Sequence, residues 1–140
     1  MKLLKNKWMI IALCALLLVG LFWVCRGNIN RIDANTVLKV SFGSTPEFDG
    51  WSVEDTETFI DLFNEAQYAG KGTGEGGTPD ITVFVYFKDG SYMWVSDFDG
   101  RGLDFEVTLH GSDKKIDAWY YLNSEELKIF ILEMLDKFRT

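Results

Sequence analysis

The side chains most able to carry out catalysis are few in this sequence. Its one histidine, His110, stands shortly before Ser112 and Asp113. Residues so close along the chain rarely reach the geometry of a Ser-His-Asp triad, and nothing around Ser112 resembles a nucleophile elbow. Both cysteines, Cys14 and Cys25, fall in an apolar N-terminal segment. Triad, thiolate and multi-histidine metal chemistry are therefore not expected, and no cofactor is predicted.

Carboxylates are plentiful, and three of them are the best candidates for a cation site. Asp97, Asp99 and Asp104 lie in DFDGRGLD at 97–104, together with two glycines. Oxygen-rich turns can hold Ca²⁺, but this spacing is not that of an EF-hand and the terminal Glu is missing. An acidic turn is the simpler interpretation, so these residues are weak candidates. A carboxylate pair could also hydrolyse glycans, although no pair stands out.

A glycine motif lies in AGKGTGEGGTP at 69–79. Gly72, Gly74 and Gly77 match the spacing G-x-G-x-x-G. The dinucleotide-binding form of this motif follows a strand and opens a helix. Here a predicted helix precedes the glycines and a predicted strand follows them. We therefore expect a flexible loop without a phosphate site.

The N-terminal part of the chain holds a long apolar run. Residues 8–25, WMIIALCALLLVGLFWVC, contain no charge and no proline. A helix of this length measures roughly 27 Å, close to the hydrocarbon thickness of a bilayer. Trp8 and Trp23 lie near its two ends, where indole rings favour the headgroup layer. The run predicts a single transmembrane helix.

Charges on either side of the apolar run predict its orientation. The leader at 1–7 carries Lys2, Lys5 and Lys7, which favours a cytoplasmic N-terminus and an extracellular C-terminal domain. A cleaved signal peptide is the alternative, but the run exceeds the usual apolar region of about 7–15 residues. An uncleaved signal-anchor in a cell membrane is the favoured interpretation. A domain without cysteine suits the envelope of a Gram-positive bacterium.

The chain that follows the apolar run is strongly acidic. Residues 26–140 contain 11 Lys and Arg against 21 Asp and Glu, a net charge of −10. Such a domain is not expected to bind nucleic acid or an anionic membrane surface through charge. A basic envelope protein or a wall polymer is the expected partner, and solubility alone is the simpler explanation of the charge.

Periodicity divides this acidic part into a tether at 26–36 and a domain at 37–140. Ser52 is the predicted cap of one helix and Asn123, with Glu126, that of a closing helix. Strands are predicted at 37–42, 80–87, 91–98, 103–110 and 116–122. The order β-α-β-β-β-β-α indicates an α+β domain in which an antiparallel sheet packs against two helices.

The hairpin around Asp89-Gly90 predicts how the aromatic residues divide between the two faces of the sheet. A two-residue turn would pair Val85 with Trp94 and Tyr86 with Met93. The face expected to pack on the helices holds Ile81, Val83, Val85, Phe87, Tyr92, Trp94, Ser96 and Phe98. The candidate binding residues on the opposite face are Phe84, Tyr86, Met93, Trp119 and Tyr121. A contiguous apolar patch there would indicate a partner, unless another segment of the chain covers it.

The function predicted from these features is a non-catalytic binding or interaction module, anchored in the membrane and exposed in the bacterial envelope. Two alternatives remain open. One is a carboxylate-dependent cell-wall hydrolase, and the other is a membrane-anchored acidic immunity protein that neutralises a basic toxin.

Overall fold

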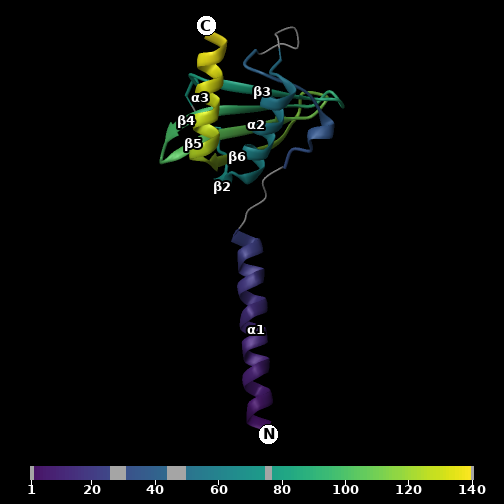
Figure 1. Ribbon diagram of the computed structural model, residues 1–140, viewed down its shortest axis with the longest axis vertical. Coiled ribbons are helices and arrows are strands. Elements are labelled where there is room, and N and C mark those ends of the chain that lie inside the picture. Colours follow the sequence, from purple (N-terminus) through teal and green to yellow (C-terminus); the bar gives the residue numbers. More distant parts are fainter. Residues whose placement is uncertain (1, 26–30, 44–49, 75–76, 140) are drawn as a thin grey trace.

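The computed structural model describes residues 2–25, 31–43, 50–74 and 77–139, which form a long N-terminal helix and an α+β domain (Figure 1). The long helix, α1, covers Lys2–Cys25. Two further helices are α2 (Val53–Glu65) and α3 (Glu125–Arg139). The strands are β1 (Val37–Ser41), β2 (Gln67–Lys71), β3 (Thr82–Phe87), β4 (Tyr92–Gly100), β5 (Leu103–His110) and β6 (Ile116–Asn123).

The sheet has six strands in the order β1-β3-β4-β5-β6-β2, and every neighbouring pair is antiparallel. The predicted α+β class is confirmed, but β2 was not predicted. Its sequence QYAGK lacks apolar alternation and reads as the end of a helix followed by a loop. Pairing with β6 makes it a strand, with a bulge between Tyr68 and Gly70. The other edge strand, β1, is also irregular, between Val37 and Lys39.

Both domain helices cover the same face of the sheet (Figure 1), and the hydrophobic core lies between them and the strands. Alternation along the strands places one apolar set toward the helices. The fully buried side chains include Phe59 and Phe63 of α2 and Leu127 of α3. The sheet contributes Val40, Val83, Val85, Met93, Val95, Phe105, Val107, Tyr120 and Leu122 to this core.

The starts of the two helices are fixed by serine caps. Ser52 accepts a hydrogen bond from the Asp55 backbone N–H at 3.1 Å, as the sequence predicts. The predicted cap at Asn123 is wrong, because Ser124 Oγ accepts from the Leu127 N–H at 3.1 Å. Asn123 instead accepts from the backbone N–H of Asp104 at 3.1 Å. Both residue types cap helices well, so the sequence alone does not select between neighbours.

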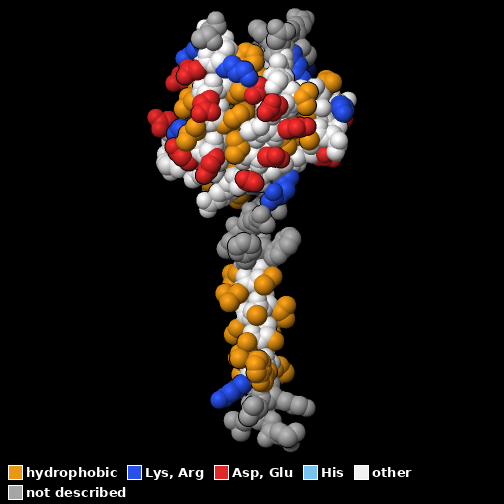
Figure 2. Space-filling model, in the orientation of Figure 1, with side chains coloured by type: hydrophobic (Ala, Val, Ile, Leu, Met, Phe, Trp, Pro, Cys, Tyr) orange, Lys and Arg blue, Asp and Glu red, His pale blue; other side chains and the backbone are white. Residues whose placement is uncertain are grey.

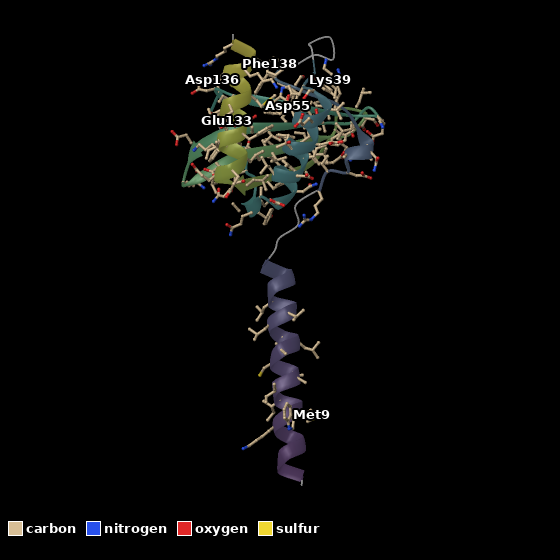
Figure 3. The ribbon with its side chains drawn as sticks, in the orientation of Figure 1. Met9, Lys39, Asp55, Glu133, Asp136 and Phe138 are labelled. Atoms are coloured by element: carbon tan, nitrogen blue, oxygen red, sulfur yellow. The ribbon has the colours of Figure 1, made fainter. Side chains whose placement is uncertain are left out.

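An ion pair joins the beginning of α2 to the end of α3. Lys137 Nζ donates to Asp55 Oδ2 at 2.7 Å, and Ser52 Oγ donates to the same oxygen at 2.6 Å. Figure 3 shows Asp55 on α2 beside α3. The hydrogen bonds from Lys137 and then from Ser52 hold the pKa of Asp55 below its usual range, since donors favour the charged carboxylate.

The end of the predicted tether packs on the domain. Ile32 is buried, and its backbone exchanges two hydrogen bonds with the Asn64 side chain, each at 2.8 Å. Arg31 donates to the Asn64 carbonyl at 2.7 Å. Arg31 and Ile32 are thereby held against α2, and the first part of the predicted tether, residues 26–30, lies outside the described residues.

Helix α1 stands apart from the α+β domain (Figure 1), and its side chains from Lys7 to Leu21 are exposed. Figure 2 shows apolar side chains around α1 and acidic ones scattered over the face of the domain that carries α2 and α3. Within the described part of the chain, no helix has the length and apolar character that a membrane span requires. The predicted transmembrane helix at 8–25 is therefore not confirmed.

The turn between β3 and β4 differs from the predicted two-residue turn. The Gly90 N–H donates to the Phe87 carbonyl at 3.1 Å, and the Phe87 N–H donates to the Ser91 carbonyl at 2.9 Å. Three residues, 88–90, therefore connect the strands, and Gly90 takes a φ of +87°, as a three-residue hairpin with a left-handed third position requires. The extra residue shifts the register by one position.

This shift exchanges the two faces of β4. Phe84 pairs with Trp94 and Val85 with Met93, so the predicted pairing of Val85 with Trp94 is wrong. Met93 is buried in the core at 1% exposure, whereas Trp94 lies on the opposite face at 37%. The β3 side of the prediction is correct, because Val83 and Val85 are fully buried.

Substitutions on β4 test this register. Met93→Ala should lower the free energy of unfolding by about 2–5 kcal/mol, because it leaves a cavity in the core. Trp94→Ala should cost clearly less, since that ring is partly solvated. Chemical denaturation of the two variants measures the difference. A larger loss for Trp94→Ala would contradict the observed register.

Candidate functional site

The face of the sheet opposite the helices, called here the outer face, carries a ladder of polar and aromatic side chains. Its central rungs pair β4 with β5: Ser96 opposite Glu106, Trp94 opposite Thr108, and Tyr92 opposite His110. Phe84 and Tyr86 extend the surface onto β3, and Trp119 extends it onto β6 opposite Thr108. The outer face is thus apolar in the middle, although a solvated sheet face is usually polar.

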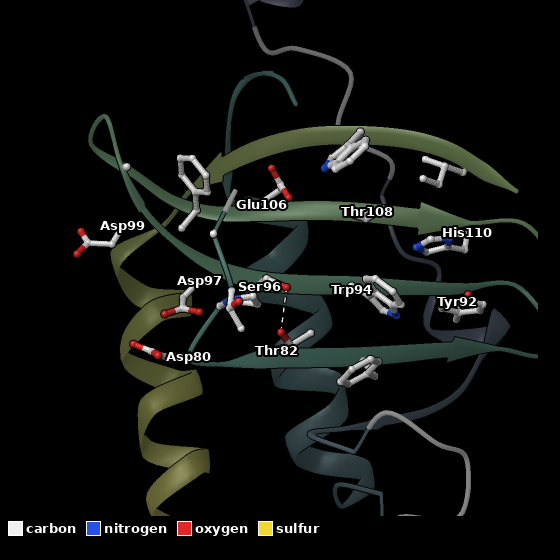
Figure 4. A pocket seen from close by; sticks show the side chains of 18 of the residues that line it. Asp80, Thr82, Tyr92, Trp94, Ser96, Asp97, Asp99, Glu106, Thr108 and His110 are labelled. Carbon is white, nitrogen blue, oxygen red and sulfur yellow. Dashed lines mark hydrogen bonds between the residues drawn. The ribbon is translucent and has the colours of Figure 1, made fainter. Parts of the chain in front are cut away.

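A cavity of about 1100 Å³ lies over this face (Figure 4). One end is acidic and is lined by Asp80, Asp97, Asp99 and Glu106. The other end is lined by Tyr92, His110, Ile116 and Lys114, with Trp94 between the two ends. Figure 4 shows the carboxylates grouped at one side of the view and Tyr92 and His110 at the other. Its volume is slightly above the usual range for ligand pockets.

Rings in van der Waals contact form the aromatic half of the cavity. Tyr92 stacks on His110 at 4.7 Å between centroids, and Trp94 lies 4.6 Å from the same imidazole. Phe84 meets Trp94 edge-on at 6.0 Å. Such contacts orient each ring through its neighbours.

His110 is the most unusual group in this surface. It is 7% exposed, and neither Nδ1 nor Nε2 has a hydrogen-bond partner among the described residues. An unsatisfied buried polar atom costs free energy, on the order of 1–3 kcal/mol. The imidazole lines the cavity, so a ligand there could satisfy one or both nitrogens.

Two other cavity atoms share this property. Glu106 Oε2 and Trp119 Nε1 are shielded from solvent and have no partner in the described part of the chain. One is an acceptor and the other a donor. Other polar groups of the lining do have partners: the Thr82 and Ser96 hydroxyls bond at 3.0 Å (Figure 4), and Asp97 Oδ1 accepts from the Ile81 N–H at 2.9 Å.

Tyr86 closes the β3 side of the cavity. Its hydroxyl donates to the Gly43 carbonyl at 3.1 Å. Burial, and secondarily the neighbouring Tyr92, raises the pKa of Tyr86 above its usual value, because a phenolate would be poorly solvated there. Tyr86 therefore acts as a neutral donor that ties Gly43, shortly after the end of β1, to the outer face.

Part of the glycine-rich segment, residues 72–74, runs over the β6 side of the outer face as a strap. The Gly72 N–H donates to the Trp119 carbonyl at 2.8 Å, and Thr73 Oγ1 lies 3.0 Å from the Tyr121 hydroxyl. A Cβ at Gly72 would come within 2.7 Å of Trp119 Cδ1, and one at Gly74 within 2.6 Å of Cζ2. The glycines are needed here because they let the backbone lie against the indole.

Only some of the predicted binding residues line the cavity. Phe84, Tyr86 and Trp119 line the cavity. Met93 does not, because the register shift buries it in the core. Tyr121 is on the outer face but is 7% exposed, covered by the strap and packed against Phe98 at 5.0 Å.

The three weak metal candidates are also separated. Asp97 and Asp99 line the acidic end of the cavity. Asp104 serves the start of α3, where Oδ2 accepts from the Ser124 N–H at 3.0 Å and Oδ1 lies 3.7 Å from Lys128 Nζ. Within the described residues, no group of three His, Cys, Asp or Glu side chains could hold a metal ion.

Sequence reasoning missed the two residues at the centre of the site, Trp94 and His110, as members of one cavity. The predicted two-residue turn places Trp94 in the core, and His110 is not among the predicted binding residues. The signal that could have joined them is Gly90, since a glycine at the third loop position favours the three-residue turn.

A pair of glycine substitutions tests the strap. Gly74 and Gly102 share a φ of +69°, but a Cβ at Gly102 meets nothing within 4 Å. Gly102→Ala should therefore cost only the strain of a left-handed residue, about 1–2 kcal/mol. Gly74→Ala should cost more, because it also overlaps Trp119. Denaturant unfolding measures both; equal losses would show that the strap does not rest on the indole.

Comparison of the chain with protein-family models, with curated proteins and with solved structures finds no match. The function must therefore be argued from the cavity itself, from its rings, its carboxylates and its unsatisfied polar atoms.

Proposed function

We propose that this chain is a non-catalytic binding module of a bacterial envelope and that its ligand occupies the cavity on the outer face. The observation that carries the proposal is His110, which is buried in the wall of a cavity of about 1100 Å³ and has no hydrogen-bond partner among the described residues. Aromatic side chains with a few converging polar groups are typical of ligand sites. A cavity built only by imperfect packing would not be expected to collect unsatisfied donors and acceptors.

We further propose that α1 attaches the module to the cell membrane, with the N-terminus in the cytoplasm and residues 31–140 outside. The uncharged run at 8–25 and the three lysines before it support this orientation. The exposed apolar side chains of α1 support attachment to a membrane, since they require an apolar environment that the domain does not supply.

The orientation is tested with protease added to intact protoplasts. Residues 31–140 should be removed, because they lie outside the bilayer, while a cytoplasmic marker survives. Protoplasts lysed before digestion provide the control. Full protection of the domain in intact protoplasts would contradict the proposed orientation.

Binding is tested on the full chain in lipid nanodiscs, with empty nanodiscs as the blank. Three probes share one phenylbutyl body: 4-phenylbutan-1-ol is neutral, 4-phenylbutylamine is a cation and 4-phenylbutyrate is an anion. At least one should bind by calorimetry, and Trp94→Ala should weaken it about fivefold or more, because the indole forms the middle of the cavity.

Ile129→Ala is the matched control, since Ile129 is an exposed apolar residue on α3, which packs on the opposite face. The affinity of the Ile129→Ala variant for each probe should equal that of the unmodified protein. Absence of any Trp94-dependent binding across the three probes would contradict the proposed site. Turnover of wall polymer that one Asp or Glu substitution abolishes would contradict a non-catalytic role.

A further inference from the structure

The charges around the cavity are unbalanced. Four carboxylates line it, those of Asp80, Asp97, Asp99 and Glu106, against one ammonium group, that of Lys114. Lys114 lies in the turn between β5 and β6, at the end of the cavity away from the carboxylates. The acidic end therefore has no cation of its own among the described lining residues, and a positive ligand group would complement it.

Among these carboxylates, Glu106 would be stabilised most by a positive group of the ligand. Its Oε2 is shielded from water and lacks a partner among the described residues. A buried anionic oxygen is stabilised strongly by a charged donor, and carbonyl or ether groups of a ligand offer no donor at all. Asp97 differs, because one of its oxygens already accepts from the Ile81 N–H.

The distance from Glu106 to the aromatic rings then limits the rest of the ligand. Thr108, opposite Trp94, is two residues along β5 from Glu106, and His110, opposite Tyr92, is four. At the rise of a strand these separations are roughly 7 and 14 Å. A ligand with its charge at Glu106 would therefore lay a body of that length over Trp94 and toward Tyr92.

We propose that the cavity binds a small amphipathic cation, with its amine or guanidinium at Glu106 and an apolar or aromatic body on Trp94 and Tyr92. The proposal rests on the binding function proposed above and names its ligand class. The aromatic faces suit either an apolar body or the positive charge itself, because their π-faces are negative. His110, which has no partner among the described residues, lies where the far end of the body would reach, so a polar group there would complete the site.

The phenylbutyl probes test this ligand class, because they differ only in charge. The amine should bind about tenfold more tightly than the alcohol, the advantage expected for one charge-assisted hydrogen bond. The anion should bind more weakly than the alcohol. Raising the ionic strength should reduce the amine's advantage, since part of it is electrostatic.

Two variants test whether Glu106 is responsible for the tighter binding of the amine. Glu106→Gln keeps the shape of the side chain and removes its charge, so the amine and the alcohol should bind almost equally. Asp61→Asn removes the same charge from an exposed site on α2, which packs on the other face, and should leave the tenfold ratio unchanged. Trp94→Ala should weaken both probes by a similar factor.

The possible outcomes distinguish a failure of the proposed ligand class from a failure of the proposed binding site. Equal affinity of amine and alcohol for the unmodified protein, or an advantage that survives Glu106→Gln, would overturn the cation proposal. A neutral sugar that binds more tightly than the amine would overturn it too. In those cases Trp94-dependent binding still supports the cavity as the site, whereas loss of all such binding removes both proposals.

Discussion

The turn at residues 88–90 is the constraint on which the rest of the domain depends. Gly90 adopts a left-handed conformation, and the hydrogen bond from its N–H to Phe87 closes a loop of three residues. Every pairing along β3 and β4 follows from that closure, since side chains alternate and a slip of one residue inverts a strand. The turn thus delivers Met93 and Val95 to the core and the indole of Trp94 to the outer face.

The two faces of the sheet are stabilised in different ways. The inner face is covered by α2 and α3 and contains aliphatic and aromatic side chains that are almost fully buried. The outer face is shielded by its own rings and by the strap at 72–74, and it retains polar atoms that no described residue satisfies. A buried imidazole without a partner among the described residues contributes nothing to stability, which supports the proposal that this face binds a ligand.

Much of the fold could be predicted from the sequence, for physical reasons that apply to each element. The stripes of α2 and α3 and the alternation of β5 are strong periodic signals, and Ser52 is a cap with the right neighbours. Prediction failed where the decisive contact is distant along the chain or finely balanced. β2 exists because it pairs with β6, and Ser124 rather than Asn123 caps α3 because Asn123 bonds to Asp104.

The candidate site was predictable only in part. An aromatic surface that includes Phe84, Tyr86 and Trp119 follows from composition and alternation, without knowledge of the turn. One additional residue in the loop between β3 and β4 is enough to move Trp94 to the outer face and Met93 into the core. The dipeptide Asp-Gly is compatible with both the two-residue and the three-residue loop. The burial of His110 between Tyr92 and Trp94 depends on the pairing of β4 with β5, which no local pattern in the sequence specifies.

The irregular edge strands would have a consequence if α1 holds the protein at a membrane surface, as proposed above. Anchoring in two dimensions raises the local concentration of neighbouring copies, and a long flat edge would then invite sheet-to-sheet polymerisation. Both edges of this sheet are five-residue strands with a bulge, and Gly70 at a φ of +121° distorts β2 further. Short, irregular edges of this kind offer little continuous backbone for a neighbouring copy to pair with.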